Sequence, residues 1–276
     1  MAKTDYTTKF AHDGTVLRHP NRPEAKYRPL RAISNFQKLM KNKEDTNAVF
    51  RIFESLPSSD FMERVDAFAM SERGQFLRDS ERSLPEILDD HAELRKTPKG
   101  SLAHAYCDFM ETEGLTAAGL VAEQESLGRA KYDDFVQWFG ERSRDTHDLF
   151  HVLTGYGRDA LGEQCVLLFT HGQSPSHGHL LIGYAGAANI KKLIWGSKAP
   201  VMGAVQQARA TGKGAPRLIE QPIRELLKQP LEQVRLALNI PEPTQYNECH
   251  RIWREEGIDP YGVLGSANTE AEAVAA

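Results

Sequence analysis

The sequence predicts an all-α protein, a multi-helix bundle. Apolar residues recur three or four positions apart, as in Leu30, Ile33 and Phe36, which is the spacing of a helix with one buried face. Alternating β-branched runs are rare, and no Asn-Gly or Asp-Gly pair separates two of them, so strands and hairpins are not indicated. Helices that bury their apolar faces against one another are the architecture that this pattern favours.

The chain divides into three parts by composition. Residues 1–28 are polar and rich in Pro, Asn and Arg, so we expect an extended arm outside the core. Helical signals begin at Pro29 and continue through residues 29–264, which we interpret as one helical domain. The small, polar residues 265–276 are predicted to form a flexible tail.

Caps and breakers set the expected helix boundaries. Ser58 or Ser59 caps a helix that runs through Phe68, with a stop near Gly74, and Ser101 caps another that Gly114 closes. Further helices are expected at 30–40, 49–56, 85–88, 132–154, 158–169, 177–195, 201–210 and 218–227.

Composition excludes several classes of function. A formal net charge of −4 gives no basis for binding a phosphate backbone, so nucleic acid is not an expected partner. The three cysteines, Cys107, Cys165 and Cys249, have no CxxC spacing, which predicts reduced thiols and neither a disulfide framework nor a thiolate zinc site. The apolar segment 180–190 is too short to span a bilayer, although a peripheral contact with a membrane stays open.

Residues 147–163 contain the clearest sign of chemistry. His147 and His151 are four residues apart, so a helix places both imidazoles on one face, where they can bind one ion. Asp148 borders the same face and is either a third ligand or a residue that orients one. On one straight helix Glu163 would lie about 18 Å from His151, too far to share the ion.

A helix break resolves this distance. Gly155 and Gly157 allow the chain to end one helix and reverse, because glycine readily takes a positive φ. We therefore predict that the ligands lie on two adjacent antiparallel helices, with Glu163 opposite the histidines. This mixed N/O set fits Zn(II) best, and Fe(II) or Mn(II) are alternatives.

The pattern His-Asp-x-x-His, eleven residues and Glu, formed by His147, Asp148, His151 and Glu163, resembles the signature of the metal-binding coenzyme Q (ubiquinone) biosynthesis protein family. Three other stretches resemble the same family: 42–46, 101–106 and 230–240. The resemblance implies a helical protein with one metal at these four positions, where the same four residues would also be the catalytic ones.

The resemblance also implies a substrate and a setting. The expected reaction is metal-dependent removal of the C1 carboxyl group of a polyprenyl benzoate and its replacement by a hydroxyl, which is decarboxylase or lyase chemistry. The expected partners are the polyprenylated quinone precursor, other quinone biosynthesis enzymes and a membrane surface, and a homodimer stays open. The arm shows no evident transit peptide, so we expect a cytoplasmic protein, peripherally associated with the inner membrane.

Two alternatives to this function stay open at the level of sequence. The first is a lipid-binding scaffold protein that organises quinone biosynthesis enzymes, with a mainly structural metal. The second is a metallohydrolase, although Asp148 is shorter than the general-base Glu of zinc proteases.

Two features near the motif have competing interpretations. Arg144 is either a contact for a substrate carboxylate or part of an ordinary ion pair on its helix. The small residues around Gly183 and Gly186 favour close helix packing, with a groove for a prenyl chain as the alternative.

Overall fold

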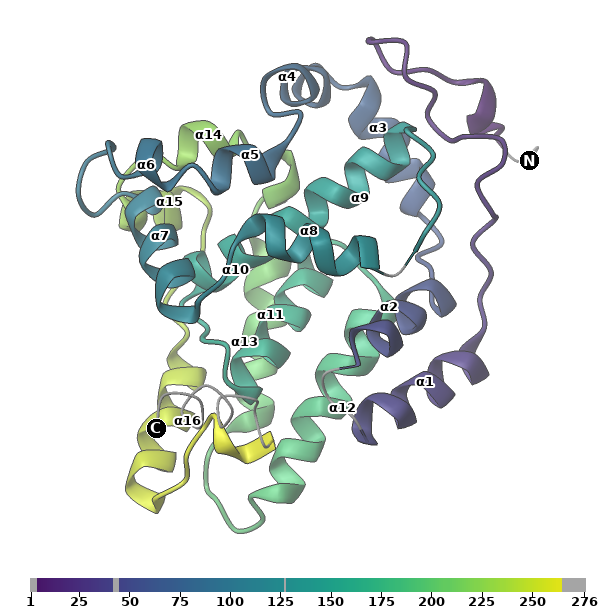
Figure 1. Ribbon diagram of the computed structural model, residues 1–276. Coiled ribbons are helices and arrows are strands. Elements are labelled where there is room, and N and C mark those ends of the chain that lie inside the picture. Colours follow the sequence, from purple (N-terminus) through teal and green to yellow (C-terminus); the bar gives the residue numbers. More distant parts are fainter. Residues whose placement is uncertain (1–3, 42–44, 127, 265–276) are drawn as a thin grey trace. The chain divides into compact units, whose positions relative to one another are not determined.

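The computed structural model describes residues 4–41, 45–126 and 128–264, and every regular element in these ranges is a helix (Figure 1). Among the described residues, β pairing is limited to two isolated bridges, Phe10 with Val16 and Ser101 with Pro230. The prediction of an all-α fold is confirmed. The predicted tail, 265–276, and residues 42–44 of the stretch 42–46 lie outside the described residues.

The chain forms two compact units. The first comprises Met1–Val152 and Arg217–Val234, and the second comprises Leu153–Pro216 and Arg235–Ala276. The predicted division into an arm, one helical domain and a tail stays a prediction. None of the helices in the described part of the chain is long and apolar enough to cross a bilayer.

The first unit contains the amino-terminal helices and two short ones from the later segment. Its elements are η1 (Tyr6–Thr8), α1 (Pro29–Lys41), α2 (Thr46–Ser55), α3 (Phe61–Met70), α4 (Glu72–Ser80), α5 (Leu84–Leu88), α6 (His91–Leu94), α7 (Leu102–Glu113), α8 (Ala117–Ser126), α9 (Phe135–Asp145), η2 (Leu218–Glu220) and α14 (Ile223–Leu226). Two helices, α10 (His147–Thr154) and α15 (Leu231–Ala237), continue into the second unit.

The ends of α7 follow the predicted caps. Ser101 Oγ accepts a hydrogen bond from the backbone N–H of His104 at 3.2 Å, which satisfies one of the donors at the start of the helix. Gly114 ends the helix in the left-handed conformation with φ 65°. Both predictions are confirmed.

The amino-terminal segment contributes to the core of the first unit, which corrects the expectation of an arm outside it. Ala11 and Leu17 are buried in a cluster with residues of α3 and α9, including Phe68 and Trp138, whose rings stack 6.2 Å apart. The segment is polar on average, but Leu17 has no exposed surface, and the backbone carbonyls of Val16 and Leu17 accept hydrogen bonds from the start of α9.

A buried ion pair holds the later segment of the first unit in place. Arg142 Nη2 donates to Glu81 Oε2 at 2.8 Å, and both side chains are almost fully buried. Arg142 also donates to the backbone carbonyls of Ile219 and Gln221, while Glu81 accepts from the backbone N–H of Arg224 at 2.7 Å. Because backbone groups of the later segment form hydrogen bonds with both charged side chains, the ion pair fixes the backbone position of that segment.

Three predicted boundaries are wrong for identifiable reasons. The helix expected over 132–154 is two helices, α9 and α10, interrupted at Thr146. The helix expected over 218–227 is split into η2 and α14 at Pro222, which cannot donate a helical hydrogen bond. Gly74 lies inside α4 and does not end a helix. A Cβ at this position would come within 1.9 Å of the Phe68 carbonyl oxygen, so the glycine permits close packing of the backbone.

The second unit consists of helices packed against one another. Its elements are α11 (Ala160–Gln173), α12 (His177–Leu193), α13 (Val201–Gly214), α16 (Thr244–Glu256) and η3 (Gly262–Leu264). The helix α11 packs against both α12 and α13 (Figure 1). A Cβ on Gly183 or Gly186 would lie 1.5 Å or 2.2 Å from side chains of α11, so these glycines allow α12 to approach closely. The packing interpretation of the small residues is confirmed.

Candidate metal centre

The short helix α10 presents two imidazoles one turn apart in the first unit. The ring centroids of His147 and His151 lie 5.1 Å apart, with the rings nearly perpendicular. His147 is half-buried, whereas His151 has 1% of its surface exposed. The two rings therefore lie next to each other on one helix, as predicted.

Neighbouring rings hold His151 in a defined orientation. The ring of Phe109, on α7, stacks on it with centroids 5.5 Å apart and an angle of 19°. Asp148 is also buried, and Tyr106, on α7 like Phe109, has no exposed surface. Burial raises the pKa of Tyr106, and the negative charge of Asp148 raises it further, so this hydroxyl keeps its proton.

Arg144 takes part in an ion pair, as one of its two interpretations requires. Its Nη2 lies 2.6 Å from the carboxylate of Asp145, and its Nη1 donates to Gln124 Oε1 at 2.7 Å. Burial raises the pKa of Asp145, an effect that the guanidinium opposes. We therefore assign Arg144 a structural role in neutralising a buried carboxylate.

The predicted break after α10 lies at Gly155, whose φ is +74°. Gly157 has a different role, because a Cβ there would lie 2.9 Å from the hydroxyl oxygen of Tyr246. The backbone N–H of Gly157 donates to that same oxygen at 3.0 Å. One glycine thus supplies the reversed backbone conformation, and the other allows α16 to approach the loop.

Glu163 lies in the first turn of α11, in the second unit, and is about one third exposed. A carboxylate in this position is favoured by the unpaired N–H groups at the start of a helix. The guanidinium Nε of Arg158 lies 3.6 Å from Glu163 Oε1. A cation bound by Glu163 would compete with this arginine.

The cap of α11 is part of a buried polar network that sequence reasoning missed. Asp159 accepts hydrogen bonds from the backbone N–H groups of Leu161 and Gly162, and it also accepts one from the hydroxyl of Tyr246. His250 Nε2 lies 3.4 Å from the same carboxylate. The sequence offered one sign of this network, because Asp159 directly precedes a helix and is a suitable cap. Tyr246 and His250 could not be found in this way, because they come from α16, far along the chain.

Burial by itself would raise the pKa of Asp159, but the interactions with His250 and Tyr246 hold it below its ordinary value. The start of α11 is therefore fixed by an ionised, buried carboxylate. Because Glu163 follows four residues later, this network sets the position from which Glu163 projects.

The four predicted ligands are divided between the two units. His147, Asp148 and His151 belong to the first, and Glu163 belongs to the second. Their coordination of one ion stays a prediction, as does the antiparallel placement of the two helices. The three cysteines are free, as predicted.

Comparison with known proteins identifies relatives over most of the chain. Residues 58–244 match the family described as coenzyme Q (ubiquinone) biosynthesis protein Coq4, and this range includes all four predicted ligands. The mitochondrial ubiquinone biosynthesis protein COQ4 of Podospora anserina is 25% identical over 79% of this chain and 70% of its own length. The COQ4 homologue of Bos taurus is 26% identical over 56% of each chain.

A solved structure has the same fold. A crystal structure of a Nostoc punctiforme protein assigned to ubiquinone biosynthesis matches with a TM-score of 0.58 and 20% identity, covering 78% of this chain and 100% of that one. At this identity the likeness concerns the fold. The match of the family model over more than half of the sequence carries the assignment: this chain belongs to the coenzyme Q (ubiquinone) biosynthesis Coq4 family.

Proposed function

We propose that this ubiquinone biosynthesis protein removes the C1 carboxyl group of a polyprenylated benzoate and puts a hydroxyl in its place, with one divalent metal held by His147, Asp148, His151 and Glu163. The observation that carries the proposal is the pair of imidazoles on α10, whose rings lie 5.1 Å apart, with His151 buried and His147 half-buried. Two imidazoles with carboxylates form a donor set that suits Zn(II) or Fe(II).

The reaction has a definite stoichiometry. The carboxyl group leaves as carbon dioxide and one atom of dioxygen becomes the phenolic oxygen. A two-electron donor and two protons convert the other oxygen atom to water. A bound metal would supply Lewis acidity toward the carboxylate or phenolate of the ring.

The residues of the chain prepare the setting for this chemistry. Stacking on Phe109 fixes the ring of His151, so little side-chain entropy remains to be lost when a ligand binds. Tyr106 keeps its proton, because burial and the charge of Asp148 both raise its pKa.

The test is a turnover assay with matched variants. Purified protein loaded with Zn(II) or Fe(II) receives the C1-carboxylated prenyl precursor, dioxygen and a reductant, and mass spectrometry follows the C1-hydroxylated product. Glu163→Ala is expected to lose metal and product together, whereas Glu248→Ala, which removes an exposed carboxylate of the second unit, is expected to lose neither.

Two results would favour the alternatives. Tight binding of the precursor by the metal-loaded protein without turnover would support a lipid-binding scaffold with a structural metal. Peptide hydrolysis that disappears in Asp148→Asn would support a metallohydrolase. Full function of Glu163→Ala in cells would contradict the metal-centred proposal itself.

We further propose that the second unit docks on a membrane surface through the end of α12. Trp195 is 90% exposed and Leu193 is 53% exposed, and the exposed Lys191, Lys192 and Lys198 surround them in sequence. Exposed tryptophan beside lysines is a combination suited to the headgroup region of an anionic bilayer.

Vesicle sedimentation tests this surface. Trp195→Glu is expected to weaken binding to anionic phospholipid vesicles several-fold, whereas Phe76→Glu, at a half-exposed aromatic residue of the first unit, is expected to leave it unchanged. Equal binding by both variants would contradict the assignment. The relatives are named as mitochondrial proteins, and a cytoplasmic location for this chain stays a prediction, as does a homodimer.

A further inference from the structure

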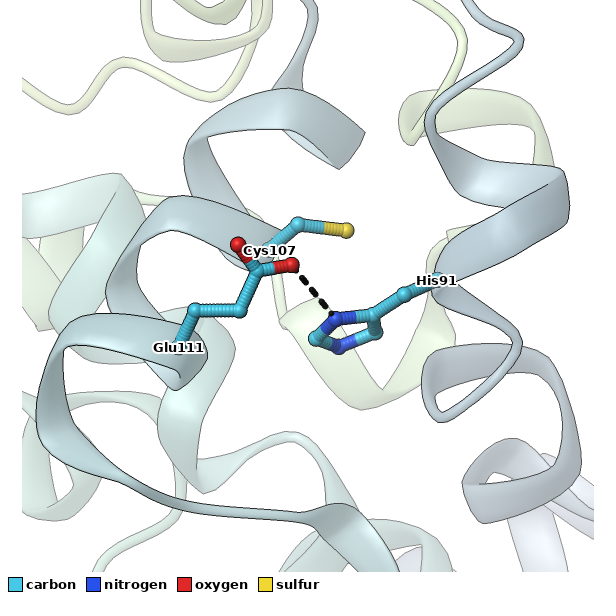
Figure 2. A group of neighbouring side chains, drawn as sticks. All are labelled: His91, Cys107 and Glu111. Carbon is cyan, nitrogen blue, oxygen red and sulfur yellow. Dashed lines mark hydrogen bonds and ion pairs between the residues drawn. The ribbon is translucent and has the colours of Figure 1, made fainter.

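A second group of potential metal ligands lies within the first unit, apart from the residues of the family signature. One ligand atom from each of His91, Cys107 and Glu111 lies within 4.8 Å of the other two. Figure 2 shows the three side chains facing one another between α6 and α7. His91 Nδ1 lies 3.0 Å from Glu111 Oε1.

The fold fixes the three side chains before any ligand binds. Cys107 and Glu111 are four residues apart on α7, which places them on one face of the helix. His91 is the first residue of α6, which Asp90 caps through the backbone N–H of Glu93 at 3.0 Å. The ring of Tyr106 meets the His91 ring edge to face at a centroid distance of 6.2 Å.

The surrounding charges suit a divalent cation. Arg95 donates to Glu111 Oε2 at 2.7 Å and to Asp108 at 2.6 Å, so its positive charge is shared between two carboxylates. This leaves Glu111 Oε1 directed at His91. With Cys107 ionised and His91 neutral, the group and its two neighbours carry a net charge of minus two, which a divalent cation neutralises.

The donor types select among metals. One sulfur, one imidazole nitrogen and one carboxylate oxygen form a set for which Zn(II) is well suited, with water as the fourth ligand of a tetrahedral ion. Interactions with His91 and Arg95 lower the pKa of Glu111, which is therefore an ionised ligand. Burial raises the pKa of the Cys107 thiol, so metal binding must displace its proton.

We propose that His91, Cys107 and Glu111 form a second metal site, selective for Zn(II), that attaches the short helix α6 to α7. This differs from the expectation from cysteine spacing that no thiolate zinc site is present, because only one of the ligands is a cysteine. Cys107 is fully buried, whereas the Glu111 side chain is 54% exposed, so the site opens toward solvent on the Glu111 side. This opening provides a path for the ion and a place for the bound water. In α6, a helix of only four residues, a metal bond from the first residue restrains the whole element.

Cobalt substitution tests the proposal with the full-length protein. Co(II) bound to a thiolate gives an intense charge-transfer band in the near ultraviolet, which nitrogen and oxygen ligands do not give. The wild type is expected to show this band on titration with Co(II), and Zn(II) is expected to abolish it. The combined His147→Ala and Glu163→Ala variant is expected to keep the band, so failure of the proposed catalytic site does not affect this readout.

Three variants locate the sulfur and its partners. Cys107→Ser is expected to lose the band. His91→Gln and Glu111→Gln, which keep the thiol, are expected to weaken Co(II) binding by at least about 10-fold, because even loss of a partner outside the coordination sphere costs that much. Glu93→Gln, which removes an exposed carboxylate of α6 outside the group and keeps all three ligands, is the matched control and is expected to retain the band. A folded wild-type protein that gives no band, or a band that survives in Cys107→Ser, would overturn the proposal.

Discussion

The two proposed metal sites draw their side chains from different parts of the chain. The proposed catalytic set takes His147 and His151 from α10 in the first unit and Glu163 from α11 in the second, and its donors are nitrogen and oxygen. The group of His91, Cys107 and Glu111 lies wholly within the first unit and includes sulfur. We therefore expect metal binding by the first set to require the folded structure of both units. Metal binding by the second group should require only the first unit.

The largest expected effect comes from removing an imidazole of the catalytic set. His151→Gln preserves the approximate volume of the buried ring, so the fold should persist while a ligand is lost. We expect affinity for Zn(II) at this set to fall by more than about 100-fold, beyond the 10- to 100-fold that loss of an outer partner costs. Isothermal titration measures this loss, and the cobalt-thiolate band should be unchanged in the same protein. A variant with wild-type stoichiometry and affinity would exclude His151 as a ligand.

A large effect is also expected on the stability of the second unit. Asp159→Ala removes the buried carboxylate that caps α11 and leaves His250 and Tyr246 without their common partner. Loss of a helix cap and loss of the partner of a buried hydroxyl each cost about 1 to 2 kcal/mol, so we expect the free energy of unfolding to fall by about 2 to 4 kcal/mol. Glu248→Ala is the exposed control, and denaturant titration of both gives the comparison. An equal, small change in the two variants would contradict the importance of the network.

The pH dependence of the same network follows from the direction of the shift. The pKa of Asp159 is lower in the folded protein than its ordinary value of about 3.9, so its contribution to stability is present above that value. The contribution is lost as the pH falls through the lower, folded pKa. Acid unfolding of the wild type and of Asp159→Asn should therefore converge at low pH. Parallel curves across the whole acid range would contradict this assignment.

A smaller effect decides the role of Asp148. If its carboxylate orients an imidazole from outside the coordination sphere, Asp148→Asn should weaken Zn(II) binding by about 10- to 100-fold without changing the stoichiometry. If it is a ligand, as the family resemblance implies, binding at this set should be lost. Metal titration combined with X-ray absorption, which counts the oxygen and nitrogen neighbours of the ion, separates the two outcomes.

Sequence reasoning succeeded where the determining interactions are local. The i, i+4 pair His147 and His151, the cap at Ser101 and the reversal at Gly155 each depend on a few neighbouring residues, and the structure contains all three. The family resemblance was confirmed by the match over residues 58–244. The all-α class followed from helical spacing alone.

Long-range interactions explain what the sequence could not reveal. His91 reaches Glu111 from a four-residue helix that no periodicity marks, and His250 reaches Asp159 from α16. Leu17 is buried in the core although its segment is polar on average, because contacts with the distant helix α9 place it there and no periodic pattern marks them. The interruption between α9 and α10 at Thr146 could not be predicted either, because no glycine or proline lies at that position.

The smallest expected effect contrasts the two arginines that contact ligand carboxylates. Arg95 bonds Glu111 and Asp108 at normal hydrogen-bond distances, whereas Arg158 lies 3.6 Å from Glu163 and is 38% exposed. An exposed pair of the second kind contributes less than about 1 kcal/mol, so Arg158→Gln should barely change stability. It should raise Zn(II) affinity at the catalytic set a few-fold, because a competing cation is removed.

Arg95→Gln should instead lower Co(II) affinity at the second group, since Glu111 loses the partner that directs it. Metal titrations measure the change in affinity that each variant causes. An increase in both variants, or a decrease in both, would contradict the distinction between a competing arginine and an orienting one.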